Sequence, residues 1–261
     1  MPAFDYSAVA DIYDAYVRTD LDVPFFIEES LRASGPVLEL MCGTGRLSLP
    51  LIRAGIPLTC VDISPDMLSE LRRKLAESGL TANIVEQDVA VLSLKEQFDL
   101  TLLPFNSFSE LTSPDDQLSA LRSIRTCLRP GGRLILTLHN PPVRLTRVTG
   151  EDYEIGRFPI DSNMGSTLIV RLKEFHDPVS NLVTGVQRFE AVSSDGHIEW
   201  SRSVNIAYRL VSENECLAMA AEAGFETEGL YGSYDRSVYR EVDSPFMIWS
   251  LRAVLQTSQL T

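Results

Sequence analysis

The sequence predicts an α/β protein with a doubly wound, mostly parallel sheet and an inserted antiparallel β-layer. Three observations favour this class. Between about residues 36 and 141, short apolar segments alternate with helix-length segments that begin at capping residues. A turn containing Gly43 and Gly45 follows the first apolar segment, as in folds that bind nucleotides at a strand-to-helix junction. From Ser166 to Leu210 apolar residues recur at every second position, which is the period of antiparallel strands.

Two short helices are expected first, one from Ser7 to about Val17 and one opened by Asp22 that ends before Gly35. Five strands follow, over Val37–Leu40, Leu58–Val61, Asn83–Asp88, Phe98–Leu103 and Arg133–Asn140. The expected helices between them cover Leu47–Ala54, Ser64 to about Gly79, and Ser113 to about Leu128. Apolar strands that alternate with capped helices are typical of a parallel sheet covered on both faces.

The alternation of apolar strands and capped helices stops at Pro141 and Pro142. Turn sequences at residues 176–181 and 193–197 divide the next segment into three expected antiparallel strands. One face of the third strand is formed by Ile198, Trp200, Val204, Ile206, Tyr208 and Leu210, and Arg202 interrupts it. We therefore expect residues 143–210 to form an inserted layer, with residues 1–142 and 211–261 as one domain.

The last part of the chain returns to the α/β pattern. A capping box at Ser212–Glu215 begins a helix that ends at Gly224. Two further strands are expected near Thr227–Tyr231 and Phe246–Val254. Together with the five earlier strands, they give a main sheet of seven.

Composition excludes several classes of protein. The net charge of −13 disfavours a nucleic-acid partner, because phosphate binding needs a basic surface, although it leaves room for a small cationic substrate. The four cysteines are scattered without histidines at ligand spacing, so we expect reduced thiols and no metal site. The N-terminus lacks the pattern of a signal peptide, and no run of 18 apolar residues occurs. We expect a cytoplasmic protein with no membrane partner.

The residues around the glycine turn favour a cationic, nucleoside-like cofactor. A dinucleotide site carries a third glycine where this chain has Ser48, and no Gly-Lys-Ser/Thr of a phosphate-binding loop follows. Glu39 lies four residues before Gly43 and would oppose a phosphate. Asp62 ends the second strand, where a carboxylate accepts ribose hydroxyls, and Asp88 ends the third, where it would accept a bond from an adenine amino group. S-adenosylmethionine fits, because it carries a ribose, an ammonium and a sulfonium.

Five segments together resemble the successive motifs of class I S-adenosylmethionine-dependent methyltransferases, in the usual order and spacing. They are VLELMCGTG, VDIS-x-x-ML, EQDV, FDLTLLPFNS and LRPGGRLILTLHN. EAGF and FMIWSLRAV resemble the closing helix and the antiparallel seventh strand of that family, so the resemblance implies a seven-stranded sheet whose last strand is antiparallel. ADIYDAYV and the inserted layer are similar to small-molecule N-methyltransferases of the amino-sugar and glycine types. The chain departs from the family at Met41, where glycine is common.

The resemblance implies a set of site residues. Glu39 and the glycine turn would lie under the methionine part of the cofactor, Asp62 would hold the ribose, and Asp88 would address the adenine edge. The implied cofactor-binding residues are Tyr13, Glu39, Gly43, Gly45, Asp62, Ile63, Met67, Asp88, Val89, Leu103 and Asn106. His139 ends the fifth strand and is a candidate general base, with a hydrogen-bonded structural histidine as the alternative.

The leading hypothesis for function is methyl transfer from S-adenosylmethionine to a small-molecule nitrogen or oxygen acceptor. A non-catalytic binder of S-adenosylmethionine or S-adenosylhomocysteine is one alternative, because it would share every cofactor residue. An NAD-dependent oxidoreductase is another, disfavoured by Ser48, by Glu39 and by the antiparallel last strand. The inserted layer is expected to be a roof over the acceptor, or else the interface of a homodimer.

Overall fold

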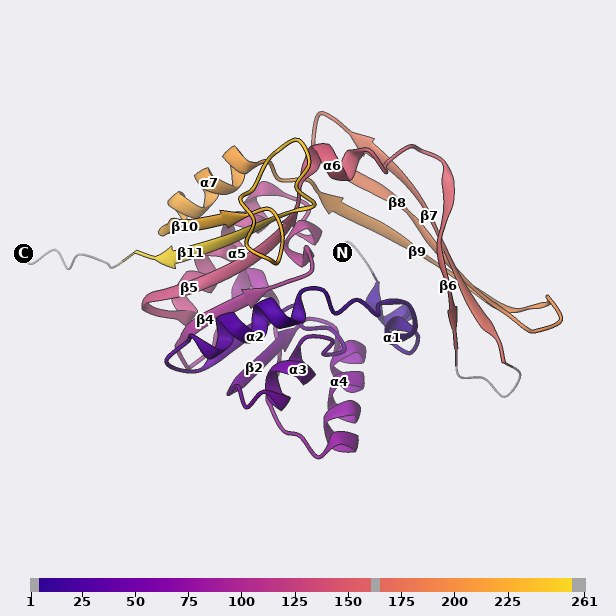
Figure 1. Cartoon of the computed structure of the whole chain (residues 1–261), viewed down its shortest axis with the longest axis horizontal. Coiled ribbons are helices and arrows are strands. Elements are labelled where there is room, and N and C mark those ends of the chain that lie inside the picture. Colours follow the sequence, from indigo (N-terminus) through magenta and orange to yellow (C-terminus); the bar gives the residue numbers. More distant parts are fainter. Residues whose placement is uncertain (1–4, 161–164, 255–261) are drawn as a thin grey trace, which may run out of the picture.

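The computed structural model describes residues 5–160 and 165–254, and a seven-stranded sheet forms its centre (Figure 1). The strands lie in the order β10-β11-β5-β4-β1-β2-β3. Their bounds are β1 (Val37–Leu40), β2 (Leu58–Asp62), β3 (Asn83–Glu86), β4 (Phe98–Leu103), β5 (Leu128–His139), β10 (Phe225–Tyr231) and β11 (Phe246–Ala253). Strand β11 runs antiparallel to both of its neighbours, while the other strands share one direction. The expected mostly parallel sheet with an antiparallel last strand is confirmed.

Helices cover both faces of this sheet. The covering helices are α2 (Val23–Leu31), α3 (Ser48–Arg53), α4 (Pro65–Ser78), α5 (Pro114–Cys127) and α7 (Glu213–Glu222), and a short helix, α6 (Pro141–Leu145), follows β5. Successive residues of β5 face opposite sides: Leu134 and Leu136 pack with α5 and α7, whereas Ile135 packs with α2, α3 and α4. A strand that is buried on both faces is a nearly continuous run of apolar residues. This is why these strands could be predicted from the sequence. No helix of the described residues is long and apolar enough to cross a membrane.

The N-terminal segment differs from the expected continuous helix. It forms a 3₁₀ turn, η1 (Tyr6–Ala8), followed by the short helix α1 (Tyr13–Tyr16). The cap of the turn is Asp5, whose carboxylate accepts a bond from the backbone N–H of Ser7. Val9 and Ile12 are buried between the two pieces, in a cluster with strands of the second sheet. Tertiary packing of these two side chains overrides the local helical pattern.

The second sheet has four antiparallel strands, so the expectation of three was wrong. Its order is β6-β7-β8-β9, with bounds β6 (Asp152–Pro159), β7 (Thr167–Asp177), β8 (Leu182–Val192) and β9 (Ile198–Arg209). Strand β6 was not predicted, because Gly156 and a register shift beside it interrupt the alternation of apolar and polar residues. It is also an edge strand whose side chains are mostly exposed, which removes the apolar signal.

The two faces of the second sheet differ in chemistry. Its inner face presents Leu168, Val170, Phe189 and Val204 to the N-terminal segment. Its outer face carries ion pairs among Asp152, Glu154, Arg157, Arg171 and Arg188. Figure 1 shows the sheet as a curved layer, with α1 between it and α4. The apolar face of β9 therefore covers the N-terminal segment.

Arg202, which interrupts that face, pairs with this segment. Its guanidinium donates to the carboxylate of Asp11 at 2.6 and 2.9 Å and to the carbonyl of Ala8 at 3.1 Å. The polar interruption on β9 is thus a contact between the second sheet and the N-terminal segment.

Gly185 is expected to be required for pairing of β7 and β8. A Cβ atom there would stand 2.2 Å from the carbonyl oxygen of Lys173, so the strands would have to separate. We expect Gly185→Ala to lower the free energy of unfolding by about 1–3 kcal/mol, the usual cost of overpacking. Urea unfolding measures this loss, with the exposed neighbour Thr184→Ala as control. Equal stability of the two variants would contradict the close approach of these strands.

Candidate functional site

The carboxyl ends of the parallel strands meet at one edge of the main sheet. Strands β1 and β4 are neighbours there although they are not consecutive in sequence, which makes a topological switch point. Ligands of open α/β sheets bind in the crevice beyond such a point. The glycine turn, residues 41–45, follows β1 at this edge, and the backbone N–H of Gln87 donates to the carbonyl of Asp62 at 3.1 Å. The exits of β2 and β3 therefore lie side by side.

The glycine turn is compact and strained. Met41, Gly43 and Gly45 have φ angles of 52°, 56° and 84°, all in the left-handed region. At Gly45 a Cβ atom would stand 2.3 Å from the Cδ1 of Leu71, so the turn approaches α4 more closely than a side chain allows. The side chain of Met41 packs against the main core and finds room there. Its departure from the family pattern therefore causes backbone strain at a positive φ angle, and no steric clash of the side chain.

Asp62 joins the turn to β2. One carboxylate oxygen accepts a bond from the backbone N–H of Gly43 at 2.7 Å, and the other accepts from that of Ser64 at 2.9 Å. The side chain is largely buried. Burial raises the pKa of Asp62, and the two backbone bonds act in the opposite direction. This carboxylate is fixed beside the turn with lone pairs left for a ligand.

Glu39 is buried beneath the turn. Ser48, which stands at the position of the third glycine of a dinucleotide site, donates its hydroxyl proton to the Glu39 carboxylate at 2.6 Å. Burial raises the pKa of Glu39 to about 8, although the Ser48 bond lowers it. Where a dinucleotide site has its third glycine, this chain therefore has a serine that is hydrogen-bonded to an acid of β1.

The predicted site residues that follow β2 and β3 differ in their surroundings. Met67 is buried, and its Cε lies 3.2 Å from where a Cβ of Gly43 would stand. Ile63 is 53% exposed, and Val89 is buried. Asp88 accepts a bond from the backbone N–H of Ala90 at 2.8 Å and thereby caps the turn η2 (Val89–Val91).

The segment after β4 contains strain and a buried polar atom. Leu103 is fully buried in the main core, and the next residues Phe105 and Asn106 have φ angles of 60° and 62°. The side-chain oxygen of Asn106 is buried and accepts no hydrogen bond from the described residues. Consecutive left-handed residues and an unsatisfied buried acceptor are typical of a ligand-binding position.

The N-terminal segment is fastened over this edge. The carboxylate of Asp14 accepts bonds from the hydroxyl of Thr44 at 2.6 Å and from the ammonium of Lys74 at 2.5 Å. Helix α1 is thus tied to both the glycine turn and α4. The ring of Tyr13 meets those of Tyr6 and Tyr16 edge-on, with centroids 6.0 and 5.5 Å apart.

Arg46 makes a second fastening. Its guanidinium binds both oxygens of Asp22 at 2.6 Å and lies over the ring of Phe105, 4.5 Å from its centroid. This pair connects the start of α2, the glycine turn and the strained segment after β4. The guanidinium of Arg46 therefore forms an ion pair with a buried carboxylate of the protein itself.

Sequence reasoning missed Glu110. This residue ends η3 (Ser107–Glu110) and accepts a bond from the phenol of Tyr6 at 2.5 Å. Burial and the neighbouring charge of Asp62 raise the pKa of Glu110 to about 7, although the Tyr6 bond lowers it. No motif marks this residue, since a single acid in an irregular segment is ordinary. Its place seven residues after the end of β4 was the only available signal.

A second polar group lies beneath the second sheet; we call Arg144, Tyr153, Glu174 and Tyr208 the roof cluster. Buried Glu174 accepts bonds from Arg144 at 2.5 Å, from Tyr208 at 2.8 Å and from Tyr153 at 3.1 Å. A terminal nitrogen of Arg144 finds no acceptor within the described chain. The ring of His139, at the end of β5, lies 5.6 Å from that of Tyr208.

The surroundings of His139 oppose its protonation. Burial, followed by the charges of Arg144 and Arg147, lowers the pKa of His139 to about 3. The imidazole is therefore neutral at physiological pH and retains an abstracted proton poorly.

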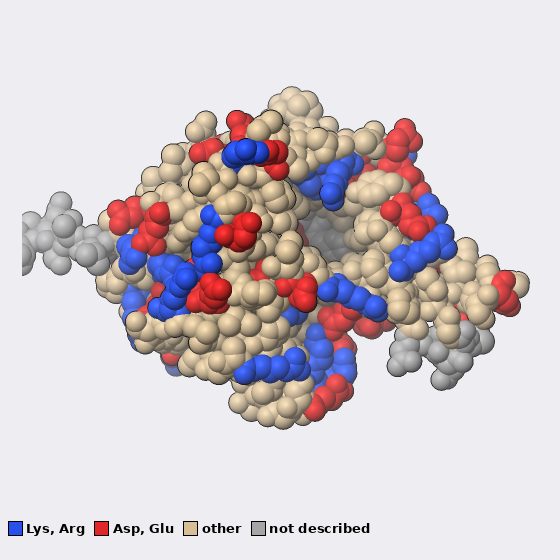
Figure 2. Space-filling model, viewed as in Figure 1, with Lys and Arg blue, Asp and Glu red and all other residues tan. Residues whose placement is uncertain are grey.

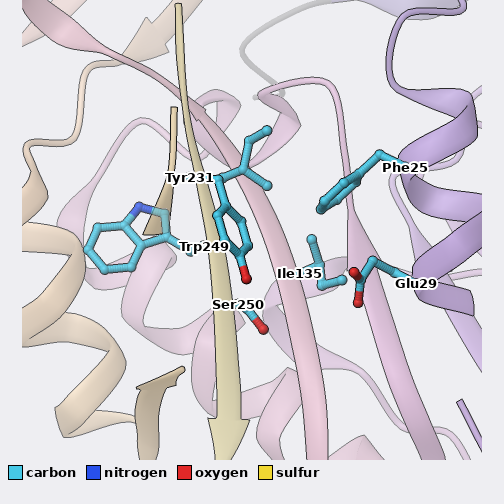
Figure 3. Close-up of a pocket in the computed structure, with 7 residues that line it drawn as sticks. Phe25, Glu29, Ile135, Tyr231, Trp249 and Ser250 are labelled. Atoms are coloured by element: carbon cyan, nitrogen blue, oxygen red, sulfur yellow. The ribbon is translucent and has the colours of Figure 1, made fainter. Parts of the chain in front are cut away.

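The surface is hollowed between the main domain and the second sheet, with both basic and acidic side chains around the rim (Figure 2). A separate small cavity lies between α2 and the sheet, lined by Phe25, Glu29, Ile135, Tyr231 and residues 248–250 (Figure 3). This cavity contains none of the residues of the glycine turn. The hollow, and not the small cavity, adjoins the carboxyl edge of the sheet.

Comparisons with known proteins agree with this geometry. Residues 37–132 match a family model described as a methyltransferase domain. The putative methyltransferase YqeM of Bacillus subtilis is 28% identical over 140 residues, which cover 52% of this chain and 56% of that relative. The cypemycin N-terminal methyltransferase of a Streptomyces species is 27% identical over 204 residues, 78% of this chain and 77% of the relative.

A solved structure extends the match to nearly the whole chain. The CcbJ methyltransferase from Streptomyces caelestis is 26% identical, covers 94% of this chain and 96% of its own, and superposes with a TM-score of 0.77. The chain spans about half the length of YqeM, whereas its agreement with CcbJ includes both sheets. The domain match runs from β1 into β5 and so contains the glycine turn, Asp62 and Asp88. Residues 37–132 therefore match a methyltransferase domain, and the chain as a whole has the fold of S-adenosylmethionine-dependent methyltransferases.

Proposed function

We propose that the protein transfers the methyl group of S-adenosylmethionine to a small-molecule acceptor, at nitrogen or oxygen. One observation carries this proposal. Glu39, Asp62 and Glu110 gather at the carboxyl edge of the sheet, and burial raises the pKa of each. In their ionised form these carboxylates repel a phosphate, which disfavours NAD, and a cationic ligand would stabilise that form and so lower the raised pKa values. Arg46 forms an ion pair with Asp22, so it does not act as the counter-ion of these three acids.

The chain offers a fitting site for the cofactor. We propose that it is held by Tyr13, Glu39, Gly43, Gly45, Asp62, Ile63, Met67, Asp88, Val89, Leu103 and Asn106. The buried oxygen of Asn106, which has no donor among the described residues, supports the fit because a ligand hydroxyl or ammonium would satisfy it. When bound, S-adenosylmethionine supplies an electrophilic methyl group on a sulfonium.

We place the acceptor in the hollow between the N-terminal segment, the end of β5 and the inner face of the second sheet. The roof cluster supports this, since the free nitrogen of Arg144 is a donor for an acceptor oxygen. The protein would contribute alignment and the exclusion of water, which can supply about 7–11 kcal/mol of the barrier. Residues 143–210 would thus serve as a substrate roof.

Two alternatives remain less favoured. A non-catalytic binder has no need of a second polar group beside the cofactor site, which is what the roof cluster provides. A homodimer through the outer face of the second sheet would bury the ion pairs of Asp152 and Glu154, at a cost in desolvation. We propose a cytoplasmic location, supported by four buried free cysteines.

Asp62→Ala is expected to weaken cofactor binding strongly. Each hydrogen bond to a charged group contributes about 1.5–3 kcal/mol, and one carboxylate can make two to a ribose. Calorimetric titration with S-adenosylhomocysteine measures the loss, and thermal unfolding checks that the fold survives. Asp66→Ala, on the exposed first turn of α4, is the control, and Asp88→Ala should cost less than Asp62→Ala. An unchanged dissociation constant in Asp62→Ala would remove Asp62 from the site.

The ligand-free protein should lose stability as the pH rises from about 5 to 8. In that window Glu39 and Glu110 keep protons that the unfolded chain releases, because their pKa values of about 8 and about 7 exceed those of free carboxylic acids. The folded state then binds more protons than the unfolded state, so the free energy of unfolding falls. Urea unfolding should show a flatter dependence in Glu39→Gln, with the exposed Glu96→Gln as control. Identical slopes in all three proteins would contradict the raised pKa of Glu39.

His139→Gln is expected to lower turnover less than about tenfold, because a histidine with a pKa of about 3 is a weak base. A true general base would contribute about 10²–10⁴-fold. Release of S-adenosylhomocysteine with the best acceptor from a set of amines, phenols and carboxylates measures this. A loss of 10²-fold or more, with cofactor binding intact, would restore His139 as the base.

A further inference from the structure

We infer that Glu110 receives the amino group of the acceptor, so that the acceptor of this methyltransferase is an amine that enters as an ammonium ion. This inference rests on the function proposed above and deepens it by naming the substrate class. It is carried by the position of Glu110, by the side chains around it, and by the lack of a cation to match its charge.

Position is the first argument. Turn η3 leaves the switch-point strand β4 and packs between the end of β5 and strand β9. Glu110 therefore lies where the main sheet, the second sheet and the N-terminal segment meet. Asp62, the proposed ribose ligand, is close enough to raise the proton affinity of Glu110. An acceptor must reach the methyl donor at this junction, because it is the carboxyl edge of the sheet.

The surroundings of Glu110 are those of a cation site. The titratable groups that face it are Tyr6 from η1, Tyr13 and Tyr16 from α1, and Asp62 from β2. The ring of Tyr13 contacts the rings of Tyr6 and Tyr16 edge-on, and aromatic rings attract a cation over their faces. Two carboxyl groups and three aromatic rings together favour a small ammonium over an anion or an apolar group.

Glu110 also lacks an internal counter-ion. Its carboxyl accepts one hydrogen bond, from the phenol of Tyr6, and forms no ion pair with any residue in the described ranges 5–160 and 165–254. The other acids of this edge also accept hydrogen bonds within the protein, Glu39 from Ser48 and Asp62 from two backbone N–H groups. Glu110 is partly exposed, whereas Glu39 is buried. Of these three acids, Glu110 is the one left for the acceptor, because Glu39 and Asp62 belong to the proposed cofactor site.

An acid in this place has a defined chemical use. The ammonium nitrogen has no lone pair, so it must lose one proton before it can act as a nucleophile. An N–H bond breaks with its electron pair left on nitrogen, and an O–H bond forms on the Glu110 carboxylate, so that charge and atoms balance. The pKa of about 7 for Glu110 lies closer to that of an alkylammonium than an ordinary carboxyl does. Tyr6 acts here as a positioning residue that holds the carboxyl in place.

The test is a titration of Glu110 itself, in protein labelled with carbon-13 at its glutamate carboxyl carbons and saturated with S-adenosylhomocysteine. Glu110→Gln assigns the signal. Methylammonium chloride is expected to lower the pKa of Glu110 by about one unit or more, because a neighbouring cation stabilises the carboxylate. Methanol, which has the same size and no charge, is expected to leave it unchanged. No response to methylammonium, or an equal response to methanol, would overturn the inference.

Additional measurements distinguish failure of this inference from failure of the proposed function. S-adenosylhomocysteine binding by the unmodified protein is measured first, and its absence would refute the function itself. Binding of S-adenosylhomocysteine together with no effect of methylammonium refutes the role of Glu110 alone. A response to phenol but not to methylammonium would make the acceptor a phenol and overturn the amine.

Two variants complete the design. Tyr6→Phe should raise the pKa of Glu110, since the Tyr6 bond lowers it, while retaining the methylammonium effect. Glu96→Gln, an exposed acid, should change neither value. With an amine acceptor, Glu110→Gln should lower turnover by about 10²-fold or more at unchanged S-adenosylhomocysteine affinity. Full turnover in Glu110→Gln would also overturn the inference.

Discussion

The structure of the site depends on the two hydrogen bonds that Asp62 accepts. One ties the glycine turn to β2 through Gly43, and the other fixes the start of α4 through Ser64. Without this carboxylate two backbone N–H groups, those of Gly43 and Ser64, would lose their acceptor, and the start of α4 would lose its bond to β2. The same side chain then retains lone pairs for a ligand, so one residue both builds the cofactor cradle and forms part of its surface.

The N-terminal segment connects the two sheets and covers the site between them. It is joined to the main domain through Asp14 and Asp22, and to the second sheet through Asp11 and the apolar residues Val9 and Ile12. Asp14 and Asp22 therefore bond to the glycine turn and the residue that follows it, while Asp11 bonds to β9. Because the segment combines apolar packing with directional bonds, it holds the second sheet at a fixed place over the carboxyl edge.

Buried acids give the site its chemical character. Glu39, Asp62 and Glu110 all have a raised pKa, which means that the fold maintains them at a cost in stability. Groups kept in unfavourable surroundings are common at functional sites, where a ligand of opposite charge relieves the cost. A cationic cofactor and an ammonium acceptor would both do so. His139 shows the reverse case, since arginines and burial keep its imidazole neutral.

The sequence by itself determined the main sheet and the cofactor edge. Strand β1 was predicted to the residue, and the helix starts at Ser64, Ser113 and Ser212 were read correctly, because buried strands and capped helices are encoded by neighbouring residues. Strand β6, the broken N-terminal helix and Glu110 were not foreseen. Val9 and Ile12 depend on the second sheet, and Glu110 on Tyr6 and Asp62, all of them distant in the chain. Strand β6 is an exposed edge strand that is defined by its pairing with β7. Only the tertiary structure decided these features, because burial and proton affinity are set by what packs around a side chain.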